Sequence, residues 1–306
     1  MNPSRAPSRI VERRRAEMIL FLMVAAWGLT FPAIKVAVQD VSPGLFMALR
    51  FGLVLVFLAA IGQGRYSRNL RPAWRDGLVL GLLLWGSYIF QAVGLKYTTA
   101  TRSGFITGLS VLIVPLIHAP LRRRLPSLRT LAAILLSLAG LWLLTRPDLG
   151  APNLGDILTL GTAVSYALYV VLMEGNAGEE RRNALIGWQV LVMAAASILV
   201  MPILDGGLPG GPGTRYLTMS VSHIMASPNL LIGLVVTVPV AIFSVVAITQ
   251  LQRHTTAVRA GVLYSAEPLF AALFAALWLG ERLDPLGLVG GGLILAGIVL
   301  AATEPD

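Results

Sequence analysis

Blocks of apolar residues, each about 18 to 25 residues long, recur along the whole chain and are separated by short polar segments. A helix of that length crosses about 30 Å of hydrocarbon, whereas the strands of a membrane barrel show short alternating segments. The pattern therefore predicts an all-α polytopic membrane protein with ten transmembrane helices. The predicted spans are 17–38, 43–61, 74–95, 100–120, 127–144, 154–174, 183–204, 229–252, 256–279 and 284–302.

The loops orient these spans. Most arginine residues lie in the N-terminal tail, 1–16, and in the loops that follow the second, fourth and sixth spans. Basic residues in short loops remain on the cytoplasmic side, so both termini are expected to be cytoplasmic. The longest connection, 205–228, contains the irregular run DGGLPGGPG, and its RYLTMSVSHIM run at 215–225 is typical of an amphipathic surface helix.

Composition agrees with a protein whose main partner is the lipid bilayer. Hydrophobic residues make up 56% of the chain and charged residues 13%, whereas soluble domains carry about 25% charged residues. The net charge of +9 is explained by arginine beside apolar blocks, so no nucleic-acid partner is expected. No small-residue cleavage site follows the first apolar block, which is therefore expected to be retained as a helix rather than removed as a signal peptide.

Motifs of common enzyme classes are absent from the sequence. There is no Walker, GxSxG or HExxH motif, and no cysteine. The three histidines, His118, His223 and His254, lack the spacing of metal ligands. We therefore expect no catalytic residues, no metal site, no cofactor and no ATP hydrolysis of the Walker type.

An internal duplication is the most informative feature. The run KYTTATRSG at 96–104 returns as RHTTAVRAG at 253–261, and the same shift places Leu138–Gly140 on Leu295–Gly297. The two copies lie five spans apart, an odd number, so they cross a membrane in opposite directions. Two five-helix halves of inverted topology around a central cavity are a recurrent plan of secondary transporters. We expect the halves to be 17–147 and 148–302.

Four runs carry a family resemblance, namely WGLTFPAIKVAV at 27–38, ALRF at 48–51, GLKYTTA at 94–100 and SAEPLFAALFAALWLGERL at 265–283. Together they resemble the EamA family of the drug/metabolite transporter superfamily. The resemblance implies ten helices in two inverted repeats. It also implies inner-membrane transport of small metabolites, often the export of amino acids. The first half departs from the pattern, with Ser110 and Arg123 where the second half has Glu267 and Gly280. Any acid-dependent step is therefore expected in the second half.

Glu267 is the main chemical candidate. It is about the twelfth residue of its span, hence roughly 17 Å deep, and an ionisable group at that depth indicates a functional site. One interpretation is a proton-coupling site or a ligand for a substrate amine. The other is a protonated acid that is hydrogen-bonded to backbone carbonyls freed by Pro268. Arg50 and Lys35 are candidates for recognising a carboxylate, or else extend toward the membrane interface.

A set of aromatic and amide side chains within the spans is typical of a wet cavity that binds organic solutes, although each alone is also explained by helix packing. Trp85, Tyr88 and Gln91 share one helical face by their spacing. The predicted cavity residues are Trp27, Phe31, Trp85, Tyr88, Gln91, Tyr166, Tyr169, Gln189, Tyr264 and Glu267.

The sequence thus favours a secondary transporter that exports small organic metabolites, with amino acids first, across a bacterial inner membrane by alternating access. Drug or nucleotide-type solutes are alternatives within transport. A membrane-embedded enzyme and a channel are alternatives of other classes. The glycine-rich tenth span, with Gly290, Gly291, Gly292 and Gly297, indicates close helix packing, either within a monomer or in a homodimer.

Overall fold

The computed structural model describes residues 6–95, 97–98, 100–123, 125–145, 152–174, 178–207, 227–279 and 285–303. Each of the ten predicted spans is helical, and no strand occurs in these ranges. Nine helical segments of these ranges are long and apolar enough to cross a membrane, and 128–144 forms a shorter apolar helix. The predicted surface helix at 215–225 and the end of the family motif, 280–283, lie outside the described residues.

The helices of the first half are α1 (Ala6–Asp40), α2 (Pro43–Gly62), α3 (Trp74–Gly94), α4 (Ala100–Gly108), α5 (Ser110–Arg122) and α6 (Leu128–Thr145). Those of the second half are α7 (Leu154–Leu172), α8 (Glu179–Gly207), α11 (Pro228–Leu251), α12 (Ala257–Tyr264), α13 (Glu267–Leu279) and α14 (Pro285–Ala302). Short 3₁₀ turns, η2 (Arg71–Ala73) and η3 (Gln252–His254), precede α3 and follow α11. Helix α1 starts before its predicted span, because residues 6–16 contain good helix formers that extend it.

Side-chain caps mark the starts of several helices. The Ser42 side chain accepts a hydrogen bond from the backbone of Leu45 and caps α2, whose first residue is a proline. Asn153 and Asp156 form a capping box at the start of α7. Ser227 caps α11 in the same way as Ser42 caps α2. These caps satisfy backbone donors that a helix end leaves unpaired.

Two predicted spans, 100–120 and 256–279, are broken helices rather than continuous ones. The break between α4 and α5 falls at Leu109, and the break between α12 and α13 falls at Ser265 and Ala266. Leu109 and Ala266 are matching positions of the duplicated segments. Pro268 explains the second break, because it has no N–H to continue the helix and its ring clashes with the preceding turn.

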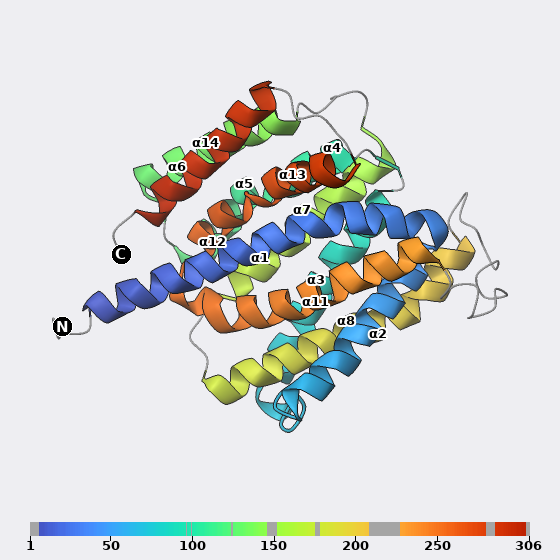
Figure 1. The fold of residues 1–306 in the computed structure, drawn as a ribbon. Helices are drawn as coiled ribbons and strands as arrows, with labels where there is room; N and C mark the ends of the chain where they lie inside the picture. The colour runs from blue at the N-terminus through green and yellow to red at the C-terminus, as the bar shows by residue number, and fades with distance from the viewer. Residues whose placement is uncertain are drawn as a thin grey trace.

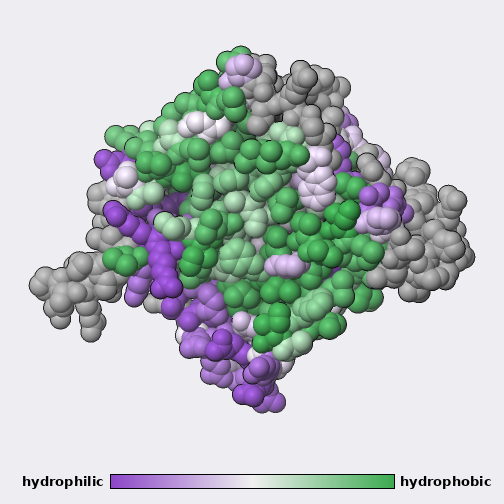
Figure 2. All heavy atoms as spheres, viewed as in Figure 1, coloured by the Kyte–Doolittle hydropathy of each residue, from purple (hydrophilic) through white to green (hydrophobic). Residues whose placement is uncertain are grey.

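Helices from the two halves interleave (Figure 1). Helix α14 packs along α6, α1 along α11, α3 along α7, and α2 along α8. Within the broken spans, α4 contacts α13 and α5 contacts α12. Helix α1 begins and α14 ends at the same end of the molecule. In Figure 2, hydrophobic residues cover the middle of the visible face and hydrophilic residues gather toward its lower left, as expected of a lipid-facing surface.

Glycines allow α6 and α14 to approach closely. A Cβ atom on Gly290 would lie 2.5 Å from the carbonyl oxygen of Gly140, and one on Gly297 would lie 2.6 Å from the hydroxyl of Ser137. A Cβ on Gly292 would meet nothing within 4 Å. Gly290 and Gly297 therefore serve packing within the chain.

The glycine contact leads to a stability prediction. Gly290→Ala should lower the free energy of unfolding by about 1–3 kcal/mol, because the added methyl group clashes with backbone of α6. Gly292→Ala is the matched control and should leave stability unchanged or slightly raised. Thermal unfolding of the two variants in detergent measures the difference. Equal melting temperatures would contradict the close contact.

Candidate functional site

A cavity lies at the centre of the bundle, between α1, α3 and α4 of the first half and α7 and α13 of the second. Its volume of about 30 Å³ holds a few water molecules, well below the roughly 300–1,000 Å³ of pockets that bind organic ligands. It must therefore widen to hold a metabolite. The central cavity is lined by Trp27, Thr30, Ile34, Leu84, Ser87, Tyr88, Gln91, Thr107, Thr162, Tyr166 and Glu267.

Five of the predicted cavity residues line this space, namely Trp27, Tyr88, Gln91, Tyr166 and Glu267. The Trp27 and Tyr166 rings meet edge to face, with 5.5 Å between their centroids. This contact gives the cavity an aromatic wall that joins the two halves.

Smaller polar residues of the lining were not predicted from the sequence. Thr30 and Ser87 follow Trp27 and Leu84 by three residues, and Thr107 and Thr162 lie on the facing helices. Helical spacing from the aromatic residues was the available signal. A buried side-chain N or O atom without a hydrogen-bond partner occurs in four lining residues, namely Trp27, Thr107, Thr162 and Tyr166. Such atoms are costly to leave unpaired, so they favour a polar ligand or water in the cavity.

The other predicted cavity residues lie elsewhere in the structure. The Trp85 indole donates a hydrogen bond to the Ser197 hydroxyl of α8 at 3.0 Å. Residues three apart differ by about 60° around a helix, so Trp85 faces a neighbouring helix while Tyr88 faces the cavity. Phe31 is partly buried on α1 and does not line the cavity.

Tyr169 and Gln189 belong to a packed polar network. The Tyr169 hydroxyl donates to Gln189 at 2.9 Å, and the Gln189 amide donates to the Thr249 hydroxyl at 3.2 Å. Both Tyr169 and Gln189 are fully buried, and the network joins α7, α8 and α11. Tyr264 packs on Tyr166 with 5.8 Å between ring centroids. Tyr169, Gln189 and Tyr264 therefore do not line the central cavity in this structure, because a helix inside a bundle has polar contacts on more than one face.

Glu267 is the first residue of α13, directly after the break, and its side chain lines the cavity. In the described part of the chain its carboxylate has neither a hydrogen bond nor an ion pair. The backbone hydrogen bonds expected of a purely structural acid are therefore missing. A helix N-terminus favours negative charge, which suits a carboxylate at this position.

Arg50 and Lys35 occupy different environments. Arg50 of α2 is 1% exposed, so the alternative of a side chain extended to the interface is wrong. Its guanidinium carbon lies 4.8 Å from the Tyr88 ring centroid and 5.1 Å from that of Phe51. Arg50 does not itself line the cavity, and Tyr88 stands between them. Lys35 is exposed on α1 and does not line the cavity either.

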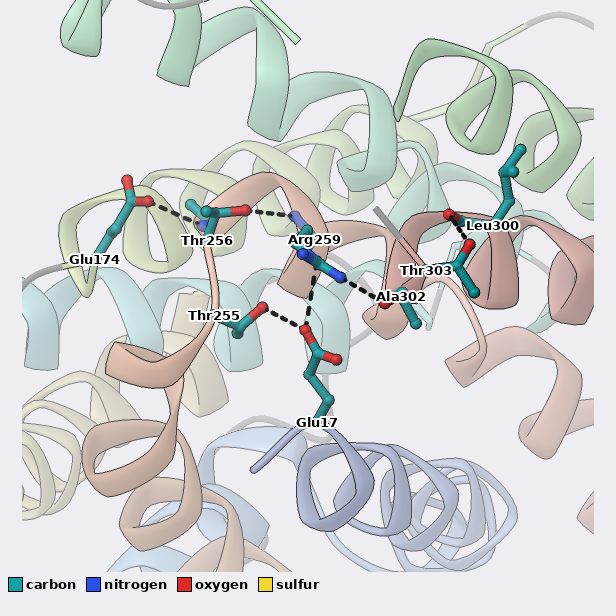
Figure 3. A network of polar contacts seen from close by, with 9 residues as sticks. Glu17, Glu174, Thr255, Thr256, Arg259, Leu300, Ala302 and Thr303 are labelled. Atoms are coloured by element: carbon teal, nitrogen blue, oxygen red, sulfur yellow. Dashed lines mark hydrogen bonds and ion pairs between the residues drawn. The ribbon is translucent and has the colours of Figure 1, made fainter. Parts of the chain in front are cut away.

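A buried polar cluster ties α1 to α12 and α14 (Figure 3). The Glu17 carboxylate accepts a hydrogen bond from the Thr255 hydroxyl at 2.9 Å and lies 3.4 Å from the Arg259 Nε. Arg259 also donates to the carbonyl oxygen of Ala302 at 2.7 Å. Nearby, the Glu174 carboxylate accepts from the backbone N–H of Ala257. We refer to Glu17, Thr255, Arg259 and Ala302 as the Glu17 cluster.

A corresponding contact lies where α7 begins. The Thr98 hydroxyl donates to the Asp156 carboxylate at 2.8 Å. Thr98 and Thr255 are matching positions of the duplication. Each donates to a carboxylate, Asp156 in the first helix of the second half and Glu17 in the first helix of the first half. We refer to Thr98 and Asp156 as the Asp156 cluster.

Metal binding has no support in this geometry. Among the residues that the structure describes, no three histidine, cysteine, aspartate or glutamate side chains lie close enough to hold a metal ion. The central cavity instead offers one carboxylate, several hydroxyl groups and aromatic faces. That set suits a small organic solute, held by hydrogen bonds, charge and ring contacts.

Comparisons with known proteins agree with this architecture. A transporter of Archaeoglobus fulgidus, named as uncharacterized, is 28% identical over 295 residues, which cover 95% of this chain and 87% of that protein. A probable amino-acid metabolite efflux pump of Escherichia coli K12 is 26% identical, with 94% of each chain covered. A solved crystal structure shares the fold, with a TM-score of 0.72 at 20% identity over 94% of this chain and 96% of that one.

The EamA-like transporter family matches the chain twice, over residues 14–146 and 153–303. The two matches follow one another along the chain and include the helices that line the central cavity. The chain therefore belongs to the EamA-like transporter family, within the drug/metabolite transporter superfamily.

Proposed function

We propose that this protein is a secondary transporter that exports small organic metabolites, amino acids foremost, across the bacterial inner membrane by alternating access. The observation that carries the proposal is the central cavity, which both halves enclose and where Glu267 lacks an internal partner. A carboxylate in that position attracts a substrate amine or a proton. The efflux-pump name of the Escherichia coli relative supports amino acids as first substrates to test.

The packing of the helices supports an inverted repeat. Contacts of α4 with α13 and of α5 with α12 are those of two spans that cross in opposite directions. The pair α1 and α11 has a counterpart in α7 and α3, as an exchange of the two halves requires. Such a pair of halves can rock around a fixed site and open it to each side in turn.

The two polar clusters support the same mechanism. Thr98 and Thr255 precede the two matching spans and each donates to a carboxylate. In an inverted repeat these spans start at opposite ends of the bundle, so the Asp156 and Glu17 clusters would close opposite ends. Breaking one and keeping the other would open the cavity to one side only. With both formed, the cavity has a volume of only about 30 Å³. We assign the Glu17 cluster to the cytoplasmic side, where the arginine-rich loops and the two termini are expected.

Transport is tested directly with purified protein in liposomes. Labelled amino acids, nucleosides and sugars are offered, and we expect saturable uptake with counterflow for at least one amino acid. Flux without saturation or counterflow would indicate a channel. Absence of flux for every amino acid would contradict the proposed substrate class.

The role of Glu267 gives a second prediction. Glu267→Gln should abolish the response of transport to an imposed pH gradient, because the amide cannot release a proton. Glu12→Gln is the matched control, since Glu12 is exposed near the start of α1 and should keep the wild-type response. Uptake is measured at several gradients. An unchanged gradient dependence in Glu267→Gln would refute proton coupling through this acid.

The polar clusters give a third prediction, which uses the absence of native cysteine. Thr107→Cys places one thiol in the cavity, where a membrane-impermeant maleimide can report access from each side. Adding Thr255→Val should raise labelling from the cytoplasmic side several-fold, whereas Thr98→Val should raise labelling from the opposite side. Each valine removes one hydrogen bond to a carboxylate, worth about 1.5–3 kcal/mol, with little change of shape.

Each variant is purified, reconstituted in oriented vesicles and labelled with the maleimide in parallel. Thr107→Cys alone is the reference. Equal labelling of all three variants from both sides would show that the clusters do not control access. Increased labelling from the same side in both valine variants would contradict the assignment to opposite ends.

A further inference from the structure

Arg50 is a buried cation without an internal anion. Its side chain is 1% exposed, and its Nε has no hydrogen-bond partner. Across the described part of the chain, no carboxylate forms an ion pair with it. Removing a guanidinium from water without such a partner is strongly unfavourable. A feature that destabilises the folded protein in this way calls for a functional reason.

The immediate surroundings of Arg50 are aromatic. Its guanidinium lies over the rings of Tyr88 and Phe51, whose centroids are 5.4 Å apart. Contacts of a cation with ring faces offset only part of the desolvation cost. Tyr88 is shared, since it covers Arg50 and lines the central cavity at the same time. The guanidinium is therefore one side chain away from the cavity.

The cavity offers an opposite charge without a partner. Glu267 lines it, and Trp27 and Tyr166 contribute aromatic walls with unpaired polar atoms. Arg50 and Glu267 together make the region neutral while each charge stays unsatisfied by the protein. A ligand that carries one positive and one negative group would satisfy both.

We propose that Arg50 is the anion-recognising residue of the transport site, covered by Tyr88 when the cavity is closed and contacted by the substrate's carboxylate when the cavity widens. The cationic end of the substrate then binds Glu267 and the rings of Trp27 and Tyr166. The site accordingly selects zwitterions over amines and over acids of the same shape. This inference rests on the proposed transport function and adds Arg50 as the residue that recognises the substrate's carboxylate.

The small volume of the cavity gives a physical reason for the covering role of Tyr88. A space of about 30 Å³ must expand before any amino acid enters, so residues of the lining have to move. Tyr88 is partly buried, whereas the Phe51 ring beneath Arg50 is fully buried. Movement of Tyr88 is therefore the shorter route by which the guanidinium reaches the cavity. A carboxylate can then form a two-point contact with the guanidinium.

The test compares three ligands of one shape, namely phenylalanine, 2-phenylethylamine and 3-phenylpropionate. Binding to purified wild-type protein is measured by competition with labelled phenylalanine, or directly by calorimetry. We expect phenylalanine to bind at least tenfold more tightly than either analogue. In Arg50→Gln, phenylalanine should fall to the affinity of the amine, and the affinity of the amine itself should be unchanged.

Two further variants separate recognition from folding. Arg50→Lys keeps the charge and should retain part of the preference for phenylalanine over the amine. Glu267→Gln should remove the preference for phenylalanine over 3-phenylpropionate and leave the other preference in place. Each variant is checked by its elution from a sizing column and its melting temperature. Should Arg50→Gln fail to fold, Arg50→Lys and the wild-type ligand ratios still decide the question.

Distinct outcomes overturn distinct claims. Wild-type ligand ratios that persist in Arg50→Gln would overturn the role of Arg50 and leave the transporter proposal intact. Equal binding of all three ligands by the wild-type protein would overturn selection of zwitterions. Binding of none of the three, together with no amino-acid uptake in liposomes, would overturn the amino-acid proposal as well.

Discussion

Pairing of polar groups inside a bundle that faces hydrocarbon is the constraint on which this structure depends. Water is not available there, so each buried donor and acceptor must find a partner within the protein. Most do, as the Tyr169, Gln189 and Thr249 side chains show by linking three helices. Among the described residues, several of the exceptions gather around the central cavity, whereas others, such as Ser137 and Thr237, lie elsewhere. Glu267, Arg50 and the polar atoms around Tyr166 are unpaired where both halves meet.

Helix breaks place that region at the centre of the bundle. The span that contains Glu267 stops after Tyr264 and restarts at Glu267, which puts a helix N-terminus and its carboxylate beside the cavity. The matching span of the first half breaks at Leu109, two residues after the lining residue Thr107. Irregular backbone is tolerated at membrane depth where it borders a cavity, and both breaks satisfy that condition. Both helix breaks therefore lie beside the cavity.

Sequence reasoning predicted the helices well and the site only in part. Apolar length and loop composition sufficed for the spans, since a membrane demands about twenty apolar residues for each helix. Proline gives a local reason for the break before Pro268. At Leu109 the local signal is weaker, because Gly108 lowers helix propensity but is tolerated in many membrane helices, so that break was not predicted.

The faces of the helices were harder to predict than their ends. Spacing alone did not tell that Trp85 faces Ser197 while Tyr88 faces the cavity, because both surroundings are polar and aromatic. For Arg50, hydropathy places the residue within a span but cannot tell a buried guanidinium from one that reaches the interface.

The duplication has been kept for some tasks and lost for others. Thr98 and Thr255 retain the same residue and the same bonding to a carboxylate, although the carboxylates differ in length and come from Asp156 and Glu17. At the position that matches Glu267, by contrast, the first half has Ser110, which is buried at the start of α5. In the proposed mechanism, groups that hold the two ends closed need equivalent partners on both sides, since a rocking bundle closes each end in turn. The proposed zwitterionic substrate has two different ends and no such symmetry, so one carboxylate and one guanidinium, each in a single half, fit it better than a duplicated pair.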